Sequence, residues 1–219
     1  MNKRKAMVFD MDGTMYDTEP ISCRCWQEVA AKYGYTVEKS LFVKMLGRDN
    51  LRIRALCMDA FGPDFPYEEI CAQKVKVQLH YYQTHDIPVK PGLKETLAYA
   101  KENGIPCAVA SSSPRQLIQY LLEKTKVADY FAVVQSGEEA KHGKPAPDIF
   151  LMACEKLGIR PEDALVLEDS ETGVLAAHAA HIPVIWIPDL VTIPEDVQQL
   201  AYARCRQMTE VPALLRKEA

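Results

Sequence analysis

Residues 5–14 read KAMVFDMDGT, an apolar run that ends in two aspartates, a glycine and a threonine. The run from Ala6 to Phe9 is continuously apolar rather than alternating, so it predicts a strand over Lys5 to Met11 that is buried on both faces, as in a parallel sheet. Similar apolar runs recur downstream, at 106–110, 131–134, 164–167 and 182–187. Helical patterns separate these runs, at 92–103, 114–124, 147–157 and 171–180. The alternation predicts an α/β domain with a parallel sheet.

Residues 17–87 break this alternation, because they contain no convincing strand pattern. Helices are expected at 18–34, with Thr18 as the cap, and then at 37–46, 50–60 and 67–84. The sequence therefore predicts a helical insert directly after the first strand, with residues 1–16 and 88–219 forming the surrounding core domain.

The composition excludes several classes of protein. The 219-residue chain carries 26 Lys and Arg against 30 Asp and Glu, and this net charge of −4 argues against a nucleic-acid partner. No apolar run approaches the ~20 residues that span a bilayer, which argues against a membrane partner. Asp10 and Asp12 interrupt the first apolar run, so it does not predict a signal peptide. The seven cysteines form no CxxC pair, which favours reduced thiols and a cytoplasmic protein.

Four short polar segments each follow a predicted strand. They are residues 10–14, 111–113, 143–148 and 168–170. In an open parallel sheet the carboxyl ends of the strands form the ligand crevice. We therefore expect these segments to converge, although they are far apart in the chain.

Carboxylates dominate the first and last of these segments. Asp10, Asp12 and Asp169 offer hard oxygens that suit Mg²⁺, whose shell would be completed by water and a substrate phosphate. Neighbouring buried charges are costly unless a cation or hydrogen-bond donors compensate them. Taken alone, residues 10–13 also fit a solvated turn, since Asp and Gly are turn formers.

The other two segments carry hydroxyls and a cation. Ser111 to Ser113 suit a phosphate at a strand-to-helix junction, although they also fit a plain cap, with Ser113 as N-cap and Pro114 at the first helical position. Lys144 projects from a loop stiffened by two prolines, or is a surface lysine in a turn. Together the four segments predict a phosphoryl-transfer site with a carboxylate nucleophile, a second carboxyl as acid and base, and donors for the anionic charge.

The same residues resemble a known family. Asp10 to Thr14, Ser111, Lys144 and the pair Glu168–Asp169 are similar, in order, to the four motifs of the haloacid dehalogenase-like hydrolases. The flanking residues 16–20 and 143–148 look like those of the subgroup that contains small-molecule phosphatases and β-phosphoglucomutase. The resemblance covers essentially the whole chain. It implies a Rossmann-like, doubly wound parallel sheet under an inserted, mobile four-helix-bundle cap.

The resemblance also implies a role for each motif residue. Asp10 would be the nucleophile and Asp12 the general acid and base. The phosphoryl group would be bound by Thr14, Ser111, Ser112 and Lys144, with Thr14 supporting the motif turn. Mg²⁺ would be held by Asp10, the backbone carbonyl of Asp12, Asp169 and Glu168, the last directly or through water. In the cap, Arg48, Asn50 and Arg52 are candidates for substrate contacts.

We therefore predict a Mg²⁺-dependent phosphatase that hydrolyses a small phosphate monoester, such as a sugar phosphate, through an aspartyl-phosphate. Its partner would be a small phosphorylated metabolite, and the protein would act as a monomer. One alternative is a phosphosugar mutase of the β-phosphoglucomutase type, but those enzymes usually carry a histidine where this chain has Ser22. An alternative of a different class is a regulatory relative that binds phosphometabolites without turnover, although the residues that catalysis needs are all present.

Overall fold

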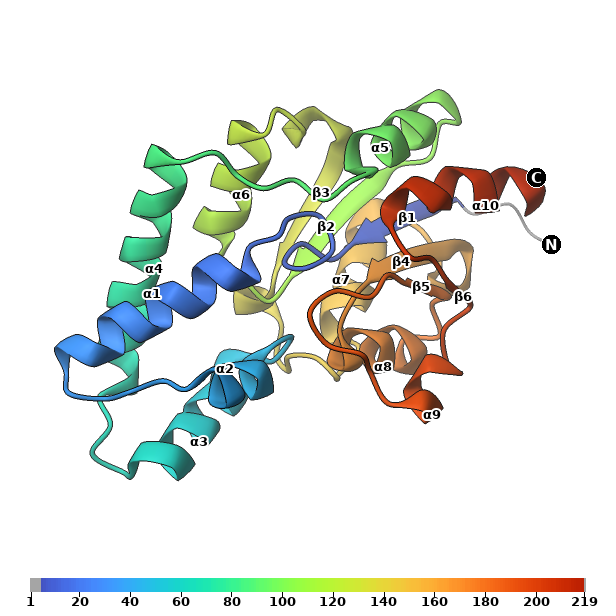
Figure 1. Ribbon diagram of the computed structural model, residues 1–219. Helices are drawn as coiled ribbons and strands as arrows, with labels where there is room; N and C mark the ends of the chain where they lie inside the picture. Colours follow the sequence, from blue (N-terminus) through green and yellow to red (C-terminus); the bar gives the residue numbers. More distant parts are fainter. Residues whose placement is uncertain (1–4, 219) are drawn as a thin grey trace.

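The computed structural model describes residues 5–218 of the chain, and its centre is a six-stranded parallel sheet (Figure 1). The strands lie in the order β3-β2-β1-β4-β5-β6. Their bounds are β1 Ala6–Phe9, β2 Cys107–Ser111, β3 Phe131–Ser136, β4 Ala164–Glu168, β5 Val184–Trp186 and β6 Ala203–Arg204. This is the order of Rossmann-type doubly wound sheets, which confirms the expected fold class. The first strand lies in the middle, where Val8 pairs with Ala108 on one side and Val166 on the other.

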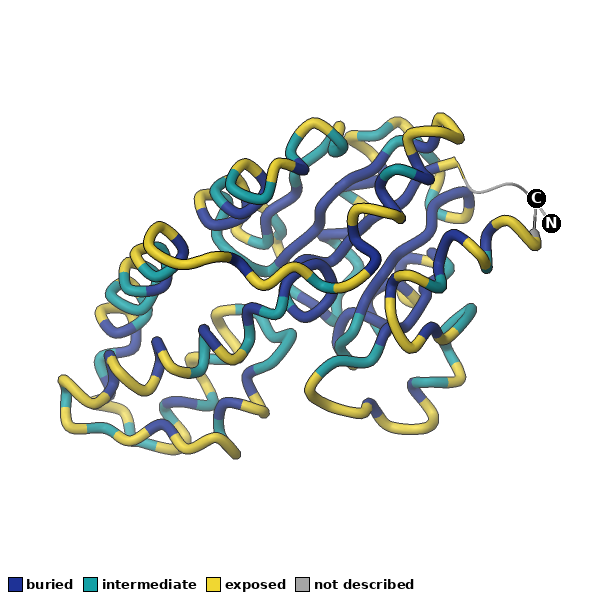
Figure 2. The backbone as a smooth tube through the Cα atoms, turned by 45° about the horizontal axis from the view of Figure 1, so that its top comes forward, coloured by how far each residue is buried: buried dark blue, intermediate teal, exposed yellow. Residues whose placement is uncertain are grey.

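Helices cover both faces of the sheet, which explains why the strand sequences are continuously apolar. Met7 and Phe9 pack with one set of helices, while Ala6 and Val8 point to the opposite set, and all four side chains are fully buried. Figure 2 shows the strands as largely buried stretches inside a more exposed shell. The first set is α5 Leu93–Glu102, α6 Arg115–Lys124 and α10 Val211–Glu218, and the second is α7 Asp148–Leu157, α8 Glu171–Ala179 and α9 Glu195–Gln198.

Residues 17–87, all of which the structure describes, contain four helices that lie to one side of the sheet (Figure 1). They are α1 Glu19–Lys32, α2 Lys39–Met45, α3 Asn50–Phe61 and α4 Tyr67–Thr84. These helices have an apolar core of their own, which includes Trp26, Phe42 and Ile70. We call α1–α4 the cap. The predicted domain limits remain a prediction, and residues 1–4 and 219 of them lie outside the described residues.

The two chain segments that join the cap to the sheet run side by side. The backbone N–H of Asp17 donates to the carbonyl of Pro88 at 2.8 Å, and the N–H of Lys90 donates to the carbonyl of Met15 at 2.9 Å. Both segments therefore leave the core at one place, and any movement of the cap must bend them together.

Several local expectations need correction. The helix expected from Pro114 begins at Arg115, with Pro114 as its N-cap, so Ser113 does not cap it. The first strand is shorter than predicted: it ends at Phe9, although the N–H of Asp10 still donates to the carbonyl of Leu167, and the chain turns at residues 13–15. After Ile187 the sequence predicted no element, whereas β6, α9 and α10 lie there. Within residues 5–218, every helix is too short or too polar to cross a membrane.

Gly92 occupies a position at which any side chain should be destabilising. It has a φ of +91°, and an added Cβ would lie 2.1 Å from the backbone nitrogen of Thr209. Because neither backbone can give way cheaply, Gly92→Ala is expected to lower the free energy of unfolding by about 3 kcal/mol. Urea denaturation followed by circular dichroism measures this change. Gly104→Ala is the control: its φ is +64° but nothing lies within 4 Å, so it should cost about 1 kcal/mol. Equal losses in the two variants would contradict the steric explanation.

Candidate active site

The predicted motif residues meet at the carboxyl ends of the central strands. Asp10 directly follows β1, and Glu168 ends the adjacent β4. Ser111 ends β2 on the other side of β1, and Lys144 reaches in from the loop between β3 and α7. This is where ligands bind in doubly wound sheets.

Lys144 is the buried cation of the site. Its side chain is 2% exposed, and its Nζ donates to Asp10 Oδ1 at 2.5 Å and to Glu168 Oε1 at 2.7 Å. Burial alone would lower the pKa of Lys144, but the two carboxylates hold it above its usual range. Lys144 is therefore charged and fixed between the ends of β1 and β4.

The carboxylates outnumber this cation. Asp10, Glu168 and Asp169 each offer an oxygen, and these three oxygens lie within 4.8 Å of one another. Burial raises the pKa of Asp10 to about 8 in spite of Lys144, and burial together with the charge of Glu168 raises that of Asp169. A divalent cation would relieve this crowding, because hard carboxylate oxygens are the ligands that Mg²⁺ prefers. The donor set thus fits the expected metal.

Hydrogen bonds hold two of the candidate metal ligands in place. Glu168 Oε2 accepts from the N–H of Ser170 at 2.6 Å and from its Oγ at 3.0 Å. Asp169 Oδ1 accepts from Thr14 Oγ1 at 2.9 Å. The hydroxyl of Thr14, which was predicted to bind phosphate, is thus engaged by Asp169. Because Gly13 has no side chain, its backbone can lie close to the carboxylate of Asp169: an added Cβ would be 2.3 Å from Asp169 Oδ2.

Three hydroxyls surround Asp12. Its Oδ1 accepts from Thr18 Oγ1 at 2.5 Å, while its Oδ2 accepts from Ser113 Oγ at 2.7 Å and from Ser111 Oγ at 3.3 Å. Thr18 is fully buried and immediately precedes the first cap helix, so this carboxylate is tied to the segment that joins core and cap. The sequence indicated a capping role for Thr18 and left a cap and a phosphate contact open for Ser113, because the local pattern of a cap and of an active-site hydroxyl is the same.

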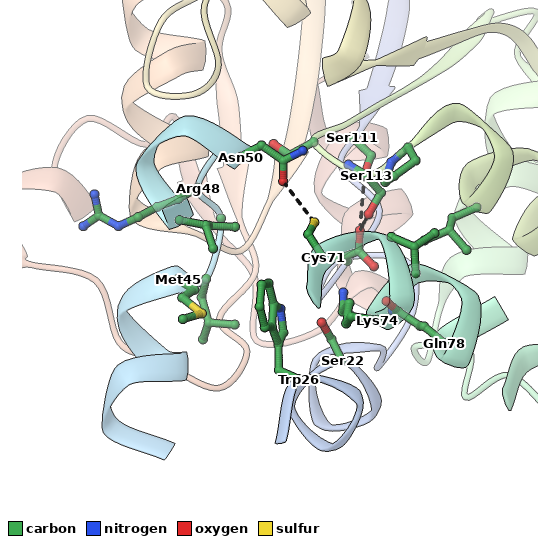
Figure 3. A pocket seen from close by; sticks show the side chains of 18 of the residues that line it. Ser22, Trp26, Met45, Arg48, Asn50, Cys71, Lys74, Gln78, Ser111 and Ser113 are labelled. Carbon is green, nitrogen blue, oxygen red and sulfur yellow. Dashed lines mark hydrogen bonds between the residues drawn. The ribbon is translucent and has the colours of Figure 1, made fainter. Parts of the chain in front are cut away.

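A cavity of about 780 Å³ extends from these residues into the cap (Figure 3). Asp10, Asp12, Ser111, Ser112 and Lys144 line its core side. The cap side includes Glu19 and Trp26 from α1, and Cys71, Lys74 and Gln78 from α4. A cavity of this size suits a small metabolite.

The three predicted cap residues are placed differently from one another. Asn50 lines the cavity, and its Oδ1 accepts from the hydroxyl of Tyr67 at 3.2 Å. Arg48 also lines it, but its Nε donates to the carbonyl of Lys44 at 2.7 Å and its guanidinium points away in Figure 3. Arg52 is not among the lining residues, and its Nε lies 3.7 Å from Asp49 Oδ2 in a salt bridge.

Three other cap residues of the cavity were missed from the sequence. Glu19, Lys74 and Gln78 were not predicted as site residues, although a signal existed for two of them. Lys74 and Gln78 follow Ile70 at helical spacing, on the buried stripe of α4, where a polar residue is unexpected. Burial raises the pKa of Glu19 to about 8 and lowers that of Lys74, and each charge opposes the shift of the other.

Comparison with known proteins identifies the family of the chain. A family model of the haloacid dehalogenase-like hydrolases matches residues 4–181. The phosphorylated carbohydrates phosphatase of Thermotoga maritima is 31% identical over 182 residues, which cover 83% of this chain and 84% of that protein. Fructose-1-phosphate phosphatase YqaB of Escherichia coli is 28% identical over 176 residues, covering 80% of this chain and 91% of that one.

Solved structures give the same result. The crystal structure of CbbY from Rhodobacter sphaeroides in complex with phosphate matches with a TM-score of 0.86 at 26% identity, covering 95% of this chain and 96% of that one. The family model spans most of the chain, and the four motif segments meet at one cavity. The chain therefore belongs to the haloacid dehalogenase-like hydrolases.

Proposed function

We propose that the protein is a Mg²⁺-dependent phosphatase that hydrolyses a small phosphate monoester, of the sugar phosphate class, through an aspartyl-phosphate. The observation that carries this proposal is the meeting of Asp10, Asp12 and Lys144 at one cavity, beside a carboxylate cluster that fits a divalent cation. The names of the relatives support it, since they describe phosphatases of phosphorylated carbohydrates and of fructose 1-phosphate.

In the first step, a carboxylate oxygen of Asp10 attacks phosphorus, and the bond from phosphorus to the ester oxygen breaks. Asp12 gives its proton to that leaving oxygen. Lys144 holds Asp10 by a hydrogen bond at 2.5 Å and places positive charge beside the transferring group. When bound to Asp10, Glu168 and Asp169, Mg²⁺ would add positive charge that stabilises the anionic transition state.

In the second step, the aspartyl-phosphate is hydrolysed. Asp12, now a carboxylate, takes a proton from a water molecule as that water attacks phosphorus, and the bond between phosphorus and Asp10 breaks. The hydroxyls of Thr18, Ser111 and Ser113 donate to Asp12, which fixes the orientation of its carboxylate at the cavity. Asp12 returns to its protonated form as phosphate leaves.

The residues on the cap side of the cavity bear on two choices: which molecule accepts the phosphoryl group, and which leaving group fits. Ser22 lines the cavity at the position where a mutase-type histidine would be expected, so water is the simpler acceptor. Glu19, Lys74 and Gln78 make this wall polar, which suits the hydroxyl groups of a sugar better than an apolar leaving group. Phosphate release from a panel of phosphorylated metabolites with Mg²⁺ tests the proposal. Release from none of them would reject it.

Metal binding gives a prediction that does not depend on turnover. Because Mg²⁺ would relieve repulsion among Asp10, Glu168 and Asp169, Mg²⁺ at about 100 times its dissociation constant should raise the melting temperature by about 5 °C. EDTA should reverse the shift and reduce phosphate release about 100-fold, until Mg²⁺ is restored. Differential scanning fluorimetry and a phosphate assay measure the two effects. Asp169→Asn is the control that should lose most of the thermal shift. Full activity in EDTA would rule out the metal assignment.

A further inference from the structure

The fourth cap helix presents a polar stripe to the cavity. Cys71, Lys74 and Gln78 follow one another at helical spacing on α4, and Figure 3 shows them facing the same cavity. Lys74 and Glu19 both line the cavity, and their opposite charges counter the pKa shift that burial imposes on each. Gln78 is the most deeply buried residue of the stripe, at 4% exposed.

Gln78 is only half satisfied by the protein. Its Nε2 donates to the hydroxyl of Tyr82 at 2.6 Å, one helical turn further along α4. Its Oε1 has no hydrogen-bond partner among the described residues, although Gln78 lines the cavity. Buried side-chain oxygens in folded proteins are nearly always paired. An unpaired, buried carbonyl oxygen on a residue that lines the cavity therefore points to a ligand that supplies the missing donor.

The position of Gln78 fits the leaving group rather than the transferring phosphoryl group. Asp10 and Lys144 mark the phosphoryl end, at the strand termini of the core. Gln78 lines the same cavity from the cap side, on α4, opposite the core residues Asp10 and Asp12. Because the phosphoryl group is held at the core side, the part of the substrate that extends toward the cap, and so toward Gln78, is the leaving group.

An amide oxygen can only accept a hydrogen bond. Its partner must be a donor such as a hydroxyl, whereas an alkyl chain or a second ionised phosphate would leave it unpaired. We propose that Gln78 is a specificity-determining residue whose Oε1 accepts a hydrogen bond from a hydroxyl of the leaving group, so that the enzyme selects esters of polyhydroxylated alcohols. This inference rests on the proposed phosphatase function and adds the residue that recognises the leaving group.

The test compares hydroxylated and plain esters in the same variant. Gln78→Leu removes the acceptor at similar volume. It is expected to lower kcat/KM for the best of fructose 1-phosphate, sorbitol 6-phosphate and ribose 5-phosphate by about 10- to 100-fold, but to leave propyl phosphate within about threefold. Unchanged turnover of propyl phosphate also shows that the variant is folded. If Gln78→Leu does not yield folded protein, the comparison is made with Gln78→Met.

Gln73→Leu is the matched control. Gln73 lies on the same helix, and its Nε2 also donates to a tyrosine hydroxyl, that of Tyr33, but it does not line the cavity. This variant should change neither substrate class. An equal loss on both classes in Gln78→Leu, or no loss on either, would overturn the inference while leaving the phosphatase in place, as would a wild-type enzyme that accepts only propyl phosphate. A wild-type enzyme that releases phosphate from none of the esters would reject the proposed function itself.

Discussion

Asp10→Asn is expected to lower kcat for phosphate release by about 10⁵-fold, because the substitution removes the proposed nucleophile while keeping the shape of the side chain. An amide nitrogen or oxygen is a far weaker nucleophile than a carboxylate. The amide oxygen can still accept the hydrogen bond from Lys144, which also retains Glu168 as a partner. The variant should therefore fold normally, and the loss should appear in kcat rather than in stability.

Two measurements check this expectation. Steady-state phosphate release gives the rate, and acid quenching of the wild-type enzyme with ³²P-labelled substrate should trap a phosphoprotein that hydroxylamine cleaves and that Asp10→Asn cannot form. Asp59→Asn is a suitable control, since Asp59 is an exposed carboxylate on α3 and should leave turnover unchanged. A labelled phosphoprotein in Asp10→Asn would place the nucleophile elsewhere.

The parts of the structure that the sequence predicted are those that local patterns determine. The apolar runs 106–110 and 164–167 became β2 and β4 to within a residue, because strands buried on both faces leave an unbroken hydrophobic signal. The predicted helix at 67–84 has the bounds of α4. Asp10 and Lys144, which are 134 positions apart, were expected to meet because parallel strands bring their carboxyl ends to one edge.

The residues that were missed depend on how separate elements pack. For Ser113 the sequence left an N-cap and a phosphate contact open, and only the folded chain shows that its hydroxyl donates to Asp12 Oδ2 at 2.7 Å. Lys74 and Gln78 follow Ile70 at helical spacing, but only the folded chain shows that this side of α4 lines a cavity shared with Asp10 and Asp12. The edge strand β6 is two residues long, which is too short for any periodicity to register.

Asp12→Asn should separate the two chemical steps, because the proton that Asp12 supplies matters only when the leaving group is a poor one. With a sugar phosphate, we expect kcat to fall about 10³-fold, because the leaving oxygen would receive no proton and the attacking water would have no base. With 4-nitrophenyl phosphate the leaving phenolate needs no proton, so the first step should proceed and the second should stall.

Stopped-flow absorbance would then record a burst of nitrophenolate equal to the enzyme concentration, followed by slow turnover, whereas the wild-type enzyme turns over steadily. The amide can still accept from Thr18, and Ser111 and Ser113 can rotate to accept from it, so the local structure should survive. The backbone carbonyl that is expected to face the metal is also unchanged. Steady, fast turnover of 4-nitrophenyl phosphate by Asp12→Asn would remove Asp12 as the base of the second step. Loss of both the burst and the turnover would instead mean that Asp12 already acts before the ester bond breaks.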